Sequence, residues 1–214
     1  MLMEEERRLI AEYGRKLSAA GLCPGTSGNI SIMDRGKGLM AISPSGMDYD
    51  IIEAEDVPVC TLCGEIAEGS RKPSSELQLH LAFYREKPHI AAIVHTHSVF
   101  CSVFAALGEP LRAVHYAIGD AGTDVVPCAP YRLFGTKELS EAAVASCGES
   151  DAVLLANHGI VCCGEDIKSA YSLAKGLEYV AEVQYRAMCI GKPHILTRQQ
   201  MEAVIDKVSS YGQK

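Results

Sequence analysis

The sequence predicts a single α/β domain, and three observations support this fold class. The chain has 214 residues, of which 48% are hydrophobic, enough to bury a sizeable core in one domain. Short apolar runs typical of buried strands alternate with longer stretches of helical periodicity. No repeat, linker or low-complexity tract interrupts this order, so we expect residues 1–214 to fold as one unit.

The first part of the chain predicts one helix followed by two hairpins. Leu9, Tyr13 and Leu17 recur at helical spacing over residues 4–20, and Gly21 ends the pattern. A glycine-rich loop follows, after which we expect strands at 30–33 and up to Ile42 around a turn at 35–38, then a hairpin at 57–66.

A second helix is expected to open at Pro73-Ser-Ser-Glu76. Ser74 or Ser75 is the expected N-cap, with Glu76 in the first turn of the helix. The later elements follow by periodicity and by turn signals: a strand at 90–97, a buried helix at 99–107, a strand at 123–128 broken at Pro127, a helix at 137–147, a strand at 152–156 continued at 160–163, a long helix at 166–190, and a last helix at 198–209 with a Thr197/Gln200 capping box.

The composition indicates the compartment of the protein and excludes some classes of binding partner. The formal net charge is -7, which gives the molecule no overall attraction for nucleic acid or for anionic lipid. No apolar run approaches the roughly 20 residues of a membrane helix. Nine cysteines, an odd number, follow an acidic start that does not resemble a secretory signal. We therefore expect reduced thiols and a cytoplasmic protein.

Two alternating histidines stand in Ile-Val-His95-Thr-His97-Ser. An extended strand points alternate side chains to one face, so both imidazoles can hold one metal ion. Neutral imidazole suits zinc, and a catalytic zinc site takes three protein ligands and leaves one position open. The pair is one ligand short, so two polar side chains on a half-exposed strand remain the alternative interpretation.

Two further residues could complete this metal site. His158 lies in a turn directly after a core strand, where side chains are presented rather than buried. Glu76, near a helix start, is a candidate fourth ligand or general base. Each also has an ordinary interpretation: a turn histidine bonded to backbone, and an acid that stabilises the helix dipole.

Three segments could bind an anion through free backbone N–H groups. They are Gly25–Asn29, Ser45–Gly46 and Ser74–Ser75, and none contains a lysine. Alternatively, they are only turns and a helix cap.

Taken in order, these motifs resemble the class II aldolase/adducin family over nearly the whole chain, from Gly21 to Tyr211. The motifs that carry the resemblance are Gly-Thr-Ser-Gly-Asn29, Ser-Pro-Ser-Gly46, Pro-Ser-Ser-Glu76, His95-Thr-His97, Val-Pro-Cys-Ala-Pro130 and Asn-His158-Gly. Within the family, His115-Tyr116, Cys128-Ala-Pro-Tyr131 and Phe134-Gly-Thr136 point to the branch that acts on L-fuculose 1-phosphate.

The resemblance implies a fold, an assembly and a role for each site residue. The fold would be a central, mostly antiparallel sheet flanked by helices, with residues 206–214 as a mobile tail. The assembly would be a homotetramer with sites between subunits. The implied metal ligands are Glu76, His95, His97 and His158 around Zn²⁺; the implied catalytic residues are Glu76, Tyr116 from a neighbouring subunit and Tyr211 in the tail; and the implied phosphate site is Gly28, Asn29, Ser45, Gly46, Ser74 and Ser75.

The resemblance also implies a reaction. A zinc-dependent lyase would cleave L-fuculose 1-phosphate, or a close ketose 1-phosphate, to dihydroxyacetone phosphate and L-lactaldehyde through a zinc-stabilised enediolate. L-Ribulose-5-phosphate 4-epimerases and methylthioribulose-1-phosphate dehydratases of the same family are alternatives. A non-catalytic interaction domain like that of adducin is a further alternative, although such a domain would not need the metal ligands that this chain keeps.

Overall fold

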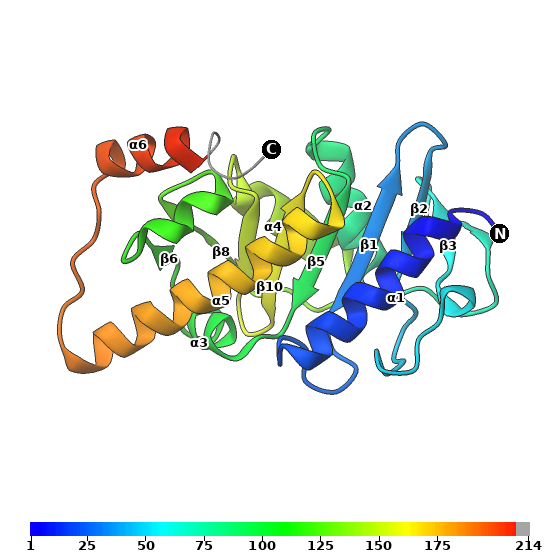
Figure 1. Cartoon of the computed structure of the whole chain (residues 1–214), viewed down its shortest axis with the longest axis horizontal. Coiled ribbons are helices and arrows are strands. Elements are labelled where there is room, and N and C mark those ends of the chain that lie inside the picture. Colours follow the sequence, from blue (N-terminus) through cyan, green and yellow to red (C-terminus); the bar gives the residue numbers. More distant parts are fainter. Residues whose placement is uncertain (209–214) are drawn as a thin grey trace.

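The computed structural model describes residues 1–208, and one large sheet forms its centre (Figure 1). The strand order is β4-β3-β2-β1-β5-β10-β9-β8. All neighbours are antiparallel except β8 and β9, which confirms the predicted mostly antiparallel sheet. The strands are β1 (Asn29–Asp34), β2 (Leu39–Ile42), β3 (Val59–Thr61), β4 (Ile66–Glu68), β5 (Ala92–Thr96), β8 (Cys128–Ala129), β9 (Ala152–Leu155) and β10 (Gly159–Gly164), with β6 (Leu111–Arg112) and β7 (Val125–Val126) in a second, two-stranded sheet.

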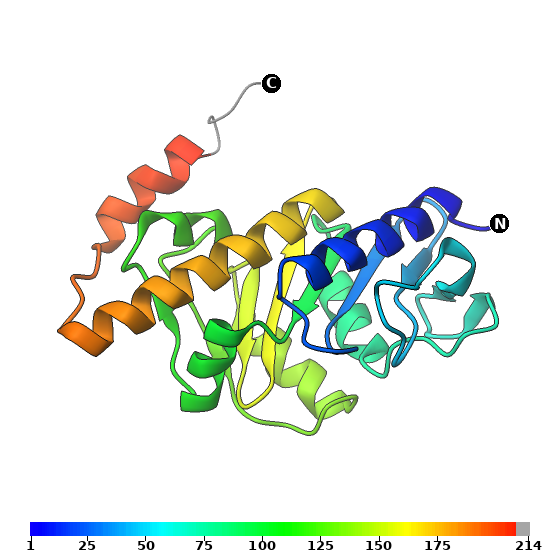
Figure 2. The same ribbon diagram turned by 60° about the horizontal axis from the view of Figure 1, so that its bottom comes forward.

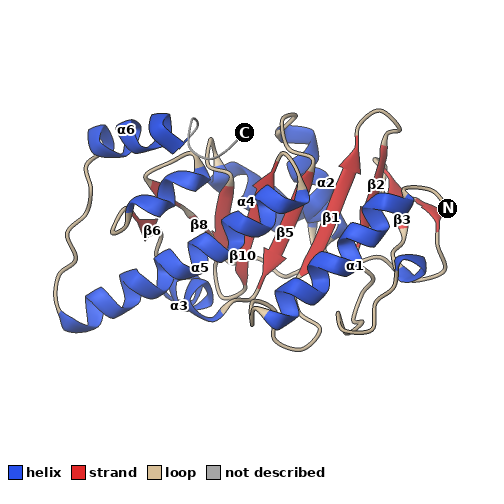
Figure 3. Ribbon diagram, viewed as in Figure 1, coloured by secondary structure: helices blue, strands red, loops and turns tan. Residues whose placement is uncertain are grey.

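Helices cover both faces of the large sheet (Figure 3). One face carries α1 (Glu4–Ala19), α3 (Val99–Leu107) and α5 (Ile167–Ile190), and Figure 2 shows α1 and α5 following one another along it. The other face carries α2 (Leu77–Glu86) and α4 (Lys137–Cys147). Two 3-10 helices, η1 (Ala54–Asp56) and η2 (Tyr116–Ala121), and a final helix, α6 (Arg198–Val208), complete the described chain. Within residues 1–208, every helix is too short or too polar to cross a membrane.

The two helical layers create two hydrophobic cores, one on each side of the sheet. Successive strand residues alternate between these cores, so Leu154 and Cys162 belong to one, and Leu155 and Cys163 to the other. A strand that is buried on both faces reads as a continuous apolar run, which is how residues 152–156 appear in the sequence. The adjacent Cys162 and Cys163 therefore lie on opposite faces of the sheet.

Most predicted elements agree with the structure to within two residues. The predicted break of the 123–128 strand at Pro127 is confirmed: Pro127 cannot donate a ladder hydrogen bond, and β7 and β8 join different sheets. At the start of α6 the capping box forms: the Thr197 and Gln200 side chains each accept a backbone N–H of the other. Residues 206–208 close α6, whereas the rest of the expected tail, including Tyr211, lies outside the described residues.

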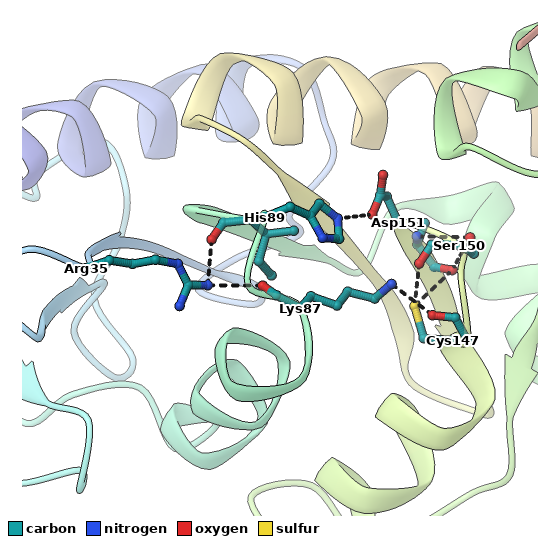
Figure 4. Close-up of polar contacts among 9 residues, drawn as sticks. Arg35, Lys87, His89, Cys147, Ser150 and Asp151 are labelled. Atoms are coloured by element: carbon teal, nitrogen blue, oxygen red, sulfur yellow. Dashed lines mark hydrogen bonds and ion pairs between the residues drawn. The ribbon is translucent and has the colours of Figure 1, made fainter. Parts of the chain in front are cut away.

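The turn that leads into β5 is held by cationic side chains (Figure 4). The Arg35 guanidinium donates to the carbonyl oxygens of Lys87 and Ile90 at 3.0 and 2.9 Å. The buried Lys87 ammonium donates to the Gly148 carbonyl oxygen at 2.9 Å, which ties the ends of α2 and α4 together. These bonds satisfy helix-end carbonyls and hold the start of β5, the strand that delivers His95 to the opposite edge of the sheet.

Gly28 allows the loop before β1 to approach β5 closely. Its φ is +76°, and a Cβ at this position would lie 2.6 Å from both the His95 carbonyl oxygen and the Cys23 Sγ. Gly25, three residues earlier, has a φ of +61° but no neighbouring atom within 4 Å of a Cβ. Both glycines adopt the left-handed conformation, but only Gly28 also needs the absence of a side chain.

Substituting each glycine by alanine should separate the conformational requirement from the steric one. Gly25→Ala should cost about 1 kcal/mol of unfolding free energy, the conformational cost alone. Gly28→Ala should lose a further ~1–3 kcal/mol, because the added methyl group overpacks the site. Urea denaturation of both variants measures the difference, and equal losses would contradict the close approach.

Candidate active site

A cavity of about 360 Å³ opens at the edge of the sheet where β5 ends. Because β1 and β10 run antiparallel to β5, their first residues lie beside its last ones: Asn29 pairs with His95, and Ile160 pairs with Thr96. Of the residues predicted for the site, those that line this one cavity are Gly28, Asn29, Ser45, Gly46, Ser74, Ser75, Glu76, His95, His97 and His158.

The three histidines face one another across this cavity. Their ligand atoms all lie within 4.8 Å of one another. The ring centroids of each pair are 4.8 to 4.9 Å apart with the planes steeply inclined, and the Nε2 atoms of His95 and His97 are 3.0 Å apart. His97 lies one residue beyond β5, and His158 follows the left-handed Asn157, a conformation that asparagine tolerates well.

Burial keeps these imidazoles neutral. It lowers the pKa of His95 well below the usual value, and the neighbouring His158 and His97 add to this effect. Burial, with a smaller contribution from His97, lowers the pKa of His158 to about 4, and burial also lowers that of His97. The Nδ1 of His95 donates to the Ile160 carbonyl oxygen at 2.9 Å, so its Nε2 keeps a lone pair that faces the cavity.

Glu76 is the buried carboxylate beside the histidines. Its Oε2 lies 3.3 Å from the His95 Nε2 and 3.7 Å from the His158 Nε2, and this buried atom has no hydrogen-bond partner. Its Oε1 accepts the Gly135 N–H at 3.2 Å. Burial raises the pKa of Glu76 to about 7, against the opposing effect of that hydrogen bond.

The expectation that Ser74 or Ser75 caps the helix, with Glu76 within its first turn, is wrong. Glu76 is the N-cap residue of α2, and the Ser74 side chain accepts its backbone N–H at 3.2 Å. The Leu77 N–H bonds to the Ser74 carbonyl oxygen at 3.1 Å, so a turn precedes the helix. This turn aims the carboxylate at the histidines instead of along the helix surface.

The serine loops are tied to one another behind the cavity. Ser43 exchanges hydrogen bonds with Ile30 of β1 through its backbone N–H and its Oγ, and its carbonyl oxygen accepts the Ser74 N–H at 3.1 Å. The Ser45 N–H bonds to the Lys72 carbonyl oxygen at 2.9 Å. The predicted anion-binding segments therefore share one wall of the cavity.

Some residues that line the cavity were not assigned to the site from the sequence. The segment after β8 passes close to Glu76, where the Gly135 N–H bonds to the carboxylate. Exposed apolar side chains and one arginine of this segment lie at the mouth of the cavity. Position alone could have suggested these residues, because they follow a strand that ends at the same sheet edge. The added lining residues are Tyr131, Arg132, Phe134 and Asn157, whereas Thr26 and Ser27, which also line the cavity, belong to the predicted anion-binding segment 25–29.

Tyr116 does not line the cavity of its own chain. It begins η2, is 59% exposed, and stacks on the His115 ring with centroids 4.7 Å apart. Its assignment to a neighbouring subunit's site stays a prediction. Tyr211 lies outside the described residues, so its role also stays a prediction.

The residues present fit a divalent metal ion. Three neutral imidazoles and one carboxylate oxygen converge, and that oxygen is buried with no protein donor to satisfy it. A nitrogen-rich set completed by one carboxylate suits zinc and other first-row divalent ions.

Comparison with known proteins places the chain in a family. The model of the class II aldolase and adducin N-terminal domain matches residues 8–185, so the chain belongs to this family, as predicted. It is a lyase of this family.

Individual relatives match along almost the full length. A 5-deoxy-D-ribulose 1-phosphate aldolase from Bacillus thuringiensis serovar kurstaki is 47% identical, with both chains covered completely. A 5-methylthioribulose-1-phosphate/5-deoxyribulose-1-phosphate aldolase from Rhodospirillum rubrum is 38% identical over 96% of this chain and 92% of the relative. A solved L-fuculose 1-phosphate aldolase superposes with a TM-score of 0.95 at 39% identity, covering 98% of each chain.

Removing one imidazole should weaken metal binding. His158→Ala should lower the affinity for Zn²⁺ by more than about 100-fold, because losing a ligand costs more than losing an outer-shell partner. Competition with a chelating dye measures this affinity. His89→Ala is the matched control, since His89 is an exposed histidine paired with Asp151 outside the cavity and its loss should leave the affinity unchanged. Equal affinities for the His158→Ala variant and the wild type would contradict the assigned ligand set.

Proposed function

We propose that the protein is a zinc-dependent aldolase that cleaves a ketose 1-phosphate to dihydroxyacetone phosphate and a small aldehyde. The observation that carries this proposal is the unsatisfied Glu76 carboxylate oxygen facing three neutral imidazoles inside a cavity walled by serine and glycine loops. Among the described residues that line the cavity there is no lysine, so no amine is placed there to form a Schiff base.

The substrate is L-fuculose 1-phosphate or a close ketose 1-phosphate with a terminal methyl group. Cleavage of L-fuculose 1-phosphate would release L-lactaldehyde, and cleavage of 5-deoxy-D-ribulose 1-phosphate would release acetaldehyde. The 47% identical relative named for 5-deoxy-D-ribulose 1-phosphate favours the second sugar. Exposed Tyr131 and Phe134 at the cavity mouth offer apolar surface to a methyl-ended fragment.

The three loops would hold the phosphate group. Gly28, Ser45 and Ser74 line one wall of the cavity. The N–H groups of Ser45 and Ser74 are bonded to the Lys72 and Ser43 carbonyl oxygens, so these two serines would offer their hydroxyl groups to the phosphate, a contact that needs no lysine. Arg132, at the mouth, adds a cation to the same cavity. With the phosphate on this wall, the carbon chain of the sugar extends toward the histidines.

Glu76 would act both as a resting metal ligand and as the catalytic acid/base. A bound zinc ion supplies Lewis-acid stabilisation for the negative charge that develops on the sugar oxygens. Glu76 holds or removes the proton at C3 of the dihydroxyacetone phosphate portion, for which it must release the ion. Its Oε1 stays anchored by the Gly135 N–H while its Oε2 is free of hydrogen bonds, which supports this double role.

The proposed assembly is a homotetramer in which Tyr116 enters the neighbour's site. Large apolar side chains remain exposed on η2 and the second half of α5, including Tyr116, Tyr179 and Met188. The His115 ring stacks on Tyr116 and meets the Tyr179 ring edge-on, so the tyrosine is held in place at the surface. Sedimentation equilibrium tests the stoichiometry, and a monomer would contradict it.

We also propose a cytoplasmic location. All nine cysteines lie in the described part of the chain and are free thiols, a state that a reducing compartment maintains. Detection of the protein in an exported fraction would contradict this.

A panel of sugar phosphates tests the proposed reaction. Zinc-loaded protein is incubated with 5-deoxy-D-ribulose 1-phosphate, L-fuculose 1-phosphate and L-ribulose 5-phosphate, and release of dihydroxyacetone phosphate is followed. We expect release from the two 1-phosphates, fastest from the 5-deoxy sugar. Epimerisation of L-ribulose 5-phosphate with no release from any sugar would overturn the aldolase proposal.

Replacing Glu76 by glutamine separates its two roles. Glu76→Gln keeps an oxygen that faces the histidines but removes the base, so we expect retained zinc and at least a 100-fold loss of C3 proton exchange in dihydroxyacetone phosphate. Deuterium uptake by NMR measures this exchange. Glu86→Gln, the same substitution at the exposed end of α2, serves as the control. Exchange at the wild-type rate in the Glu76→Gln variant would refute the base assignment.

A further inference from the structure

A buried series of hydrogen-bonded side chains extends from the protein interior to Asn29 in the cavity wall. His80 is fully buried on α2 one turn after Glu76, and its Nε2 contacts the Asn29 Oδ1. Its Nδ1 lies 2.6 Å from the Ser31 Oγ, which lies 2.8 Å from the Tyr84 hydroxyl. None of the roles assigned above uses His80, Ser31 or Tyr84.

The donor and acceptor groups of these side chains determine the direction of each hydrogen bond in the series. An amide oxygen only accepts, so the proton of the His80 ring is on Nε2, and its Nδ1 must accept from the Ser31 hydroxyl. The single hydroxyl proton of Ser31 is then used, so the Tyr84 hydroxyl is the donor between them; it lies 2.8 Å from the Ser31 Oγ and 3.1 Å from the Ser31 carbonyl oxygen, and both oxygens accept. Burial lowers the pKa of His80 to about 3, which agrees with a neutral ring carrying one N–H.

This polarity decides which end of the Asn29 amide faces the substrate. With Oδ1 engaged by His80, the amide nitrogen is left for the cavity, which Asn29 lines. Asn29 is the register partner of His95, so its side chain lies on the same face of the sheet beside a metal ligand. An amide turned the other way would present an oxygen to an anionic substrate and repel it.

We propose that His80 is a positioning residue that holds the Asn29 side chain with its N–H₂ donor toward the cavity, and that Ser31 and Tyr84 fix the ring of His80 for this purpose. The inference rests on the proposed function only in taking the ligand to be a phosphorylated sugar. A ring that served packing alone would not need a polar partner at each nitrogen, Asn29 at Nε2 and Ser31 at Nδ1, in a core where each unmatched polar group costs free energy.

The glutamine and asparagine variants of His80 form a matched pair. Glutamine places an amide N–H₂ near the position of the ring Nε2 and can still donate to Asn29, whereas asparagine reaches only as far as the ring Nδ1 and Ser31. The probe is inorganic phosphate, titrated by calorimetry into zinc-loaded protein of verified metal content. We expect His80→Asn to weaken phosphate binding about tenfold, as for one hydrogen bond to a charged group, and His80→Gln to stay within about threefold of the wild type.

A double-mutant cycle tests whether His80 acts through Asn29. In an Asn29→Ala background, His80→Asn should weaken phosphate binding no further, because the group it positions is absent. A further tenfold loss in that background, or equal losses for both His80 variants, would show that the ring only packs and would overturn the proposal.

The tautomer provides a test that needs no ligand. Long-range proton–nitrogen spectra of histidine-labelled protein should show His80 protonated at Nε2, and protonation at Nδ1 would overturn the proposal. These measurements separate this inference from the proposed function. If no sugar phosphate is cleaved but phosphate binding and the tautomer behave as expected, then the reaction is wrong and the positioning role stands.

Discussion

The antiparallel register of β5 with its two neighbours is the constraint on which the site depends. It sets Asn29 of β1 beside His95, and the start of β10 beside the end of β5. The bond from the His95 Nδ1 to the Ile160 carbonyl oxygen is available only in this register. A slip of β5 by one residue would turn His95 to the face opposite Asn29, which would separate this proposed metal ligand from the serine loops.

Burying polar side chains at this end of the sheet costs free energy of folding, and most of these groups offset the cost by bonding to an internal partner. Burial keeps the imidazoles neutral, and His95 and His80 each satisfy a ring nitrogen with an internal partner. Glu76 Oε2 is the exception, since it is buried without a donor. An unsatisfied buried carboxylate oxygen is a poor choice for stability alone. A cation between this oxygen and the imidazoles would remove the penalty, which is why the same atom supports the proposed metal site.

The sequence predicts those parts of the site that lie at the ends of strands or in turns with a clear sequence signal. His95 and His97 alternate at a strand end, and His158 follows a buried strand in an Asn-His-Gly turn, so local patterns were sufficient. Arg132 and Phe134 were missed as site residues because their position depends on the Gly135 N–H meeting Glu76, 59 residues away in the chain. His80 shares a helix face with Glu76 and Tyr84, but only the packing of α2 under β1 reveals that Asn29 and Ser31 are its partners. Such contacts between distant segments leave no periodic signal in the sequence.

The site is divided between strand ends, whose positions the sheet register sets, and the loop after β8. This division explains why the reaction class is easier to predict from the sequence than the substrate. The groups that would perform the chemistry sit on strand ends and a helix cap that are fixed by register and by buried hydrogen bonds. The groups that would meet the far end of the sugar, Tyr131 and Phe134, are exposed and held by a loop. Loops accept substitution more readily than strands buried on both faces. Relatives named for different ketose phosphates can therefore share the proposed catalytic residues at this end of the sheet while their loops differ. Choosing among those sugars requires measurement at the loop and not at the proposed metal ligands.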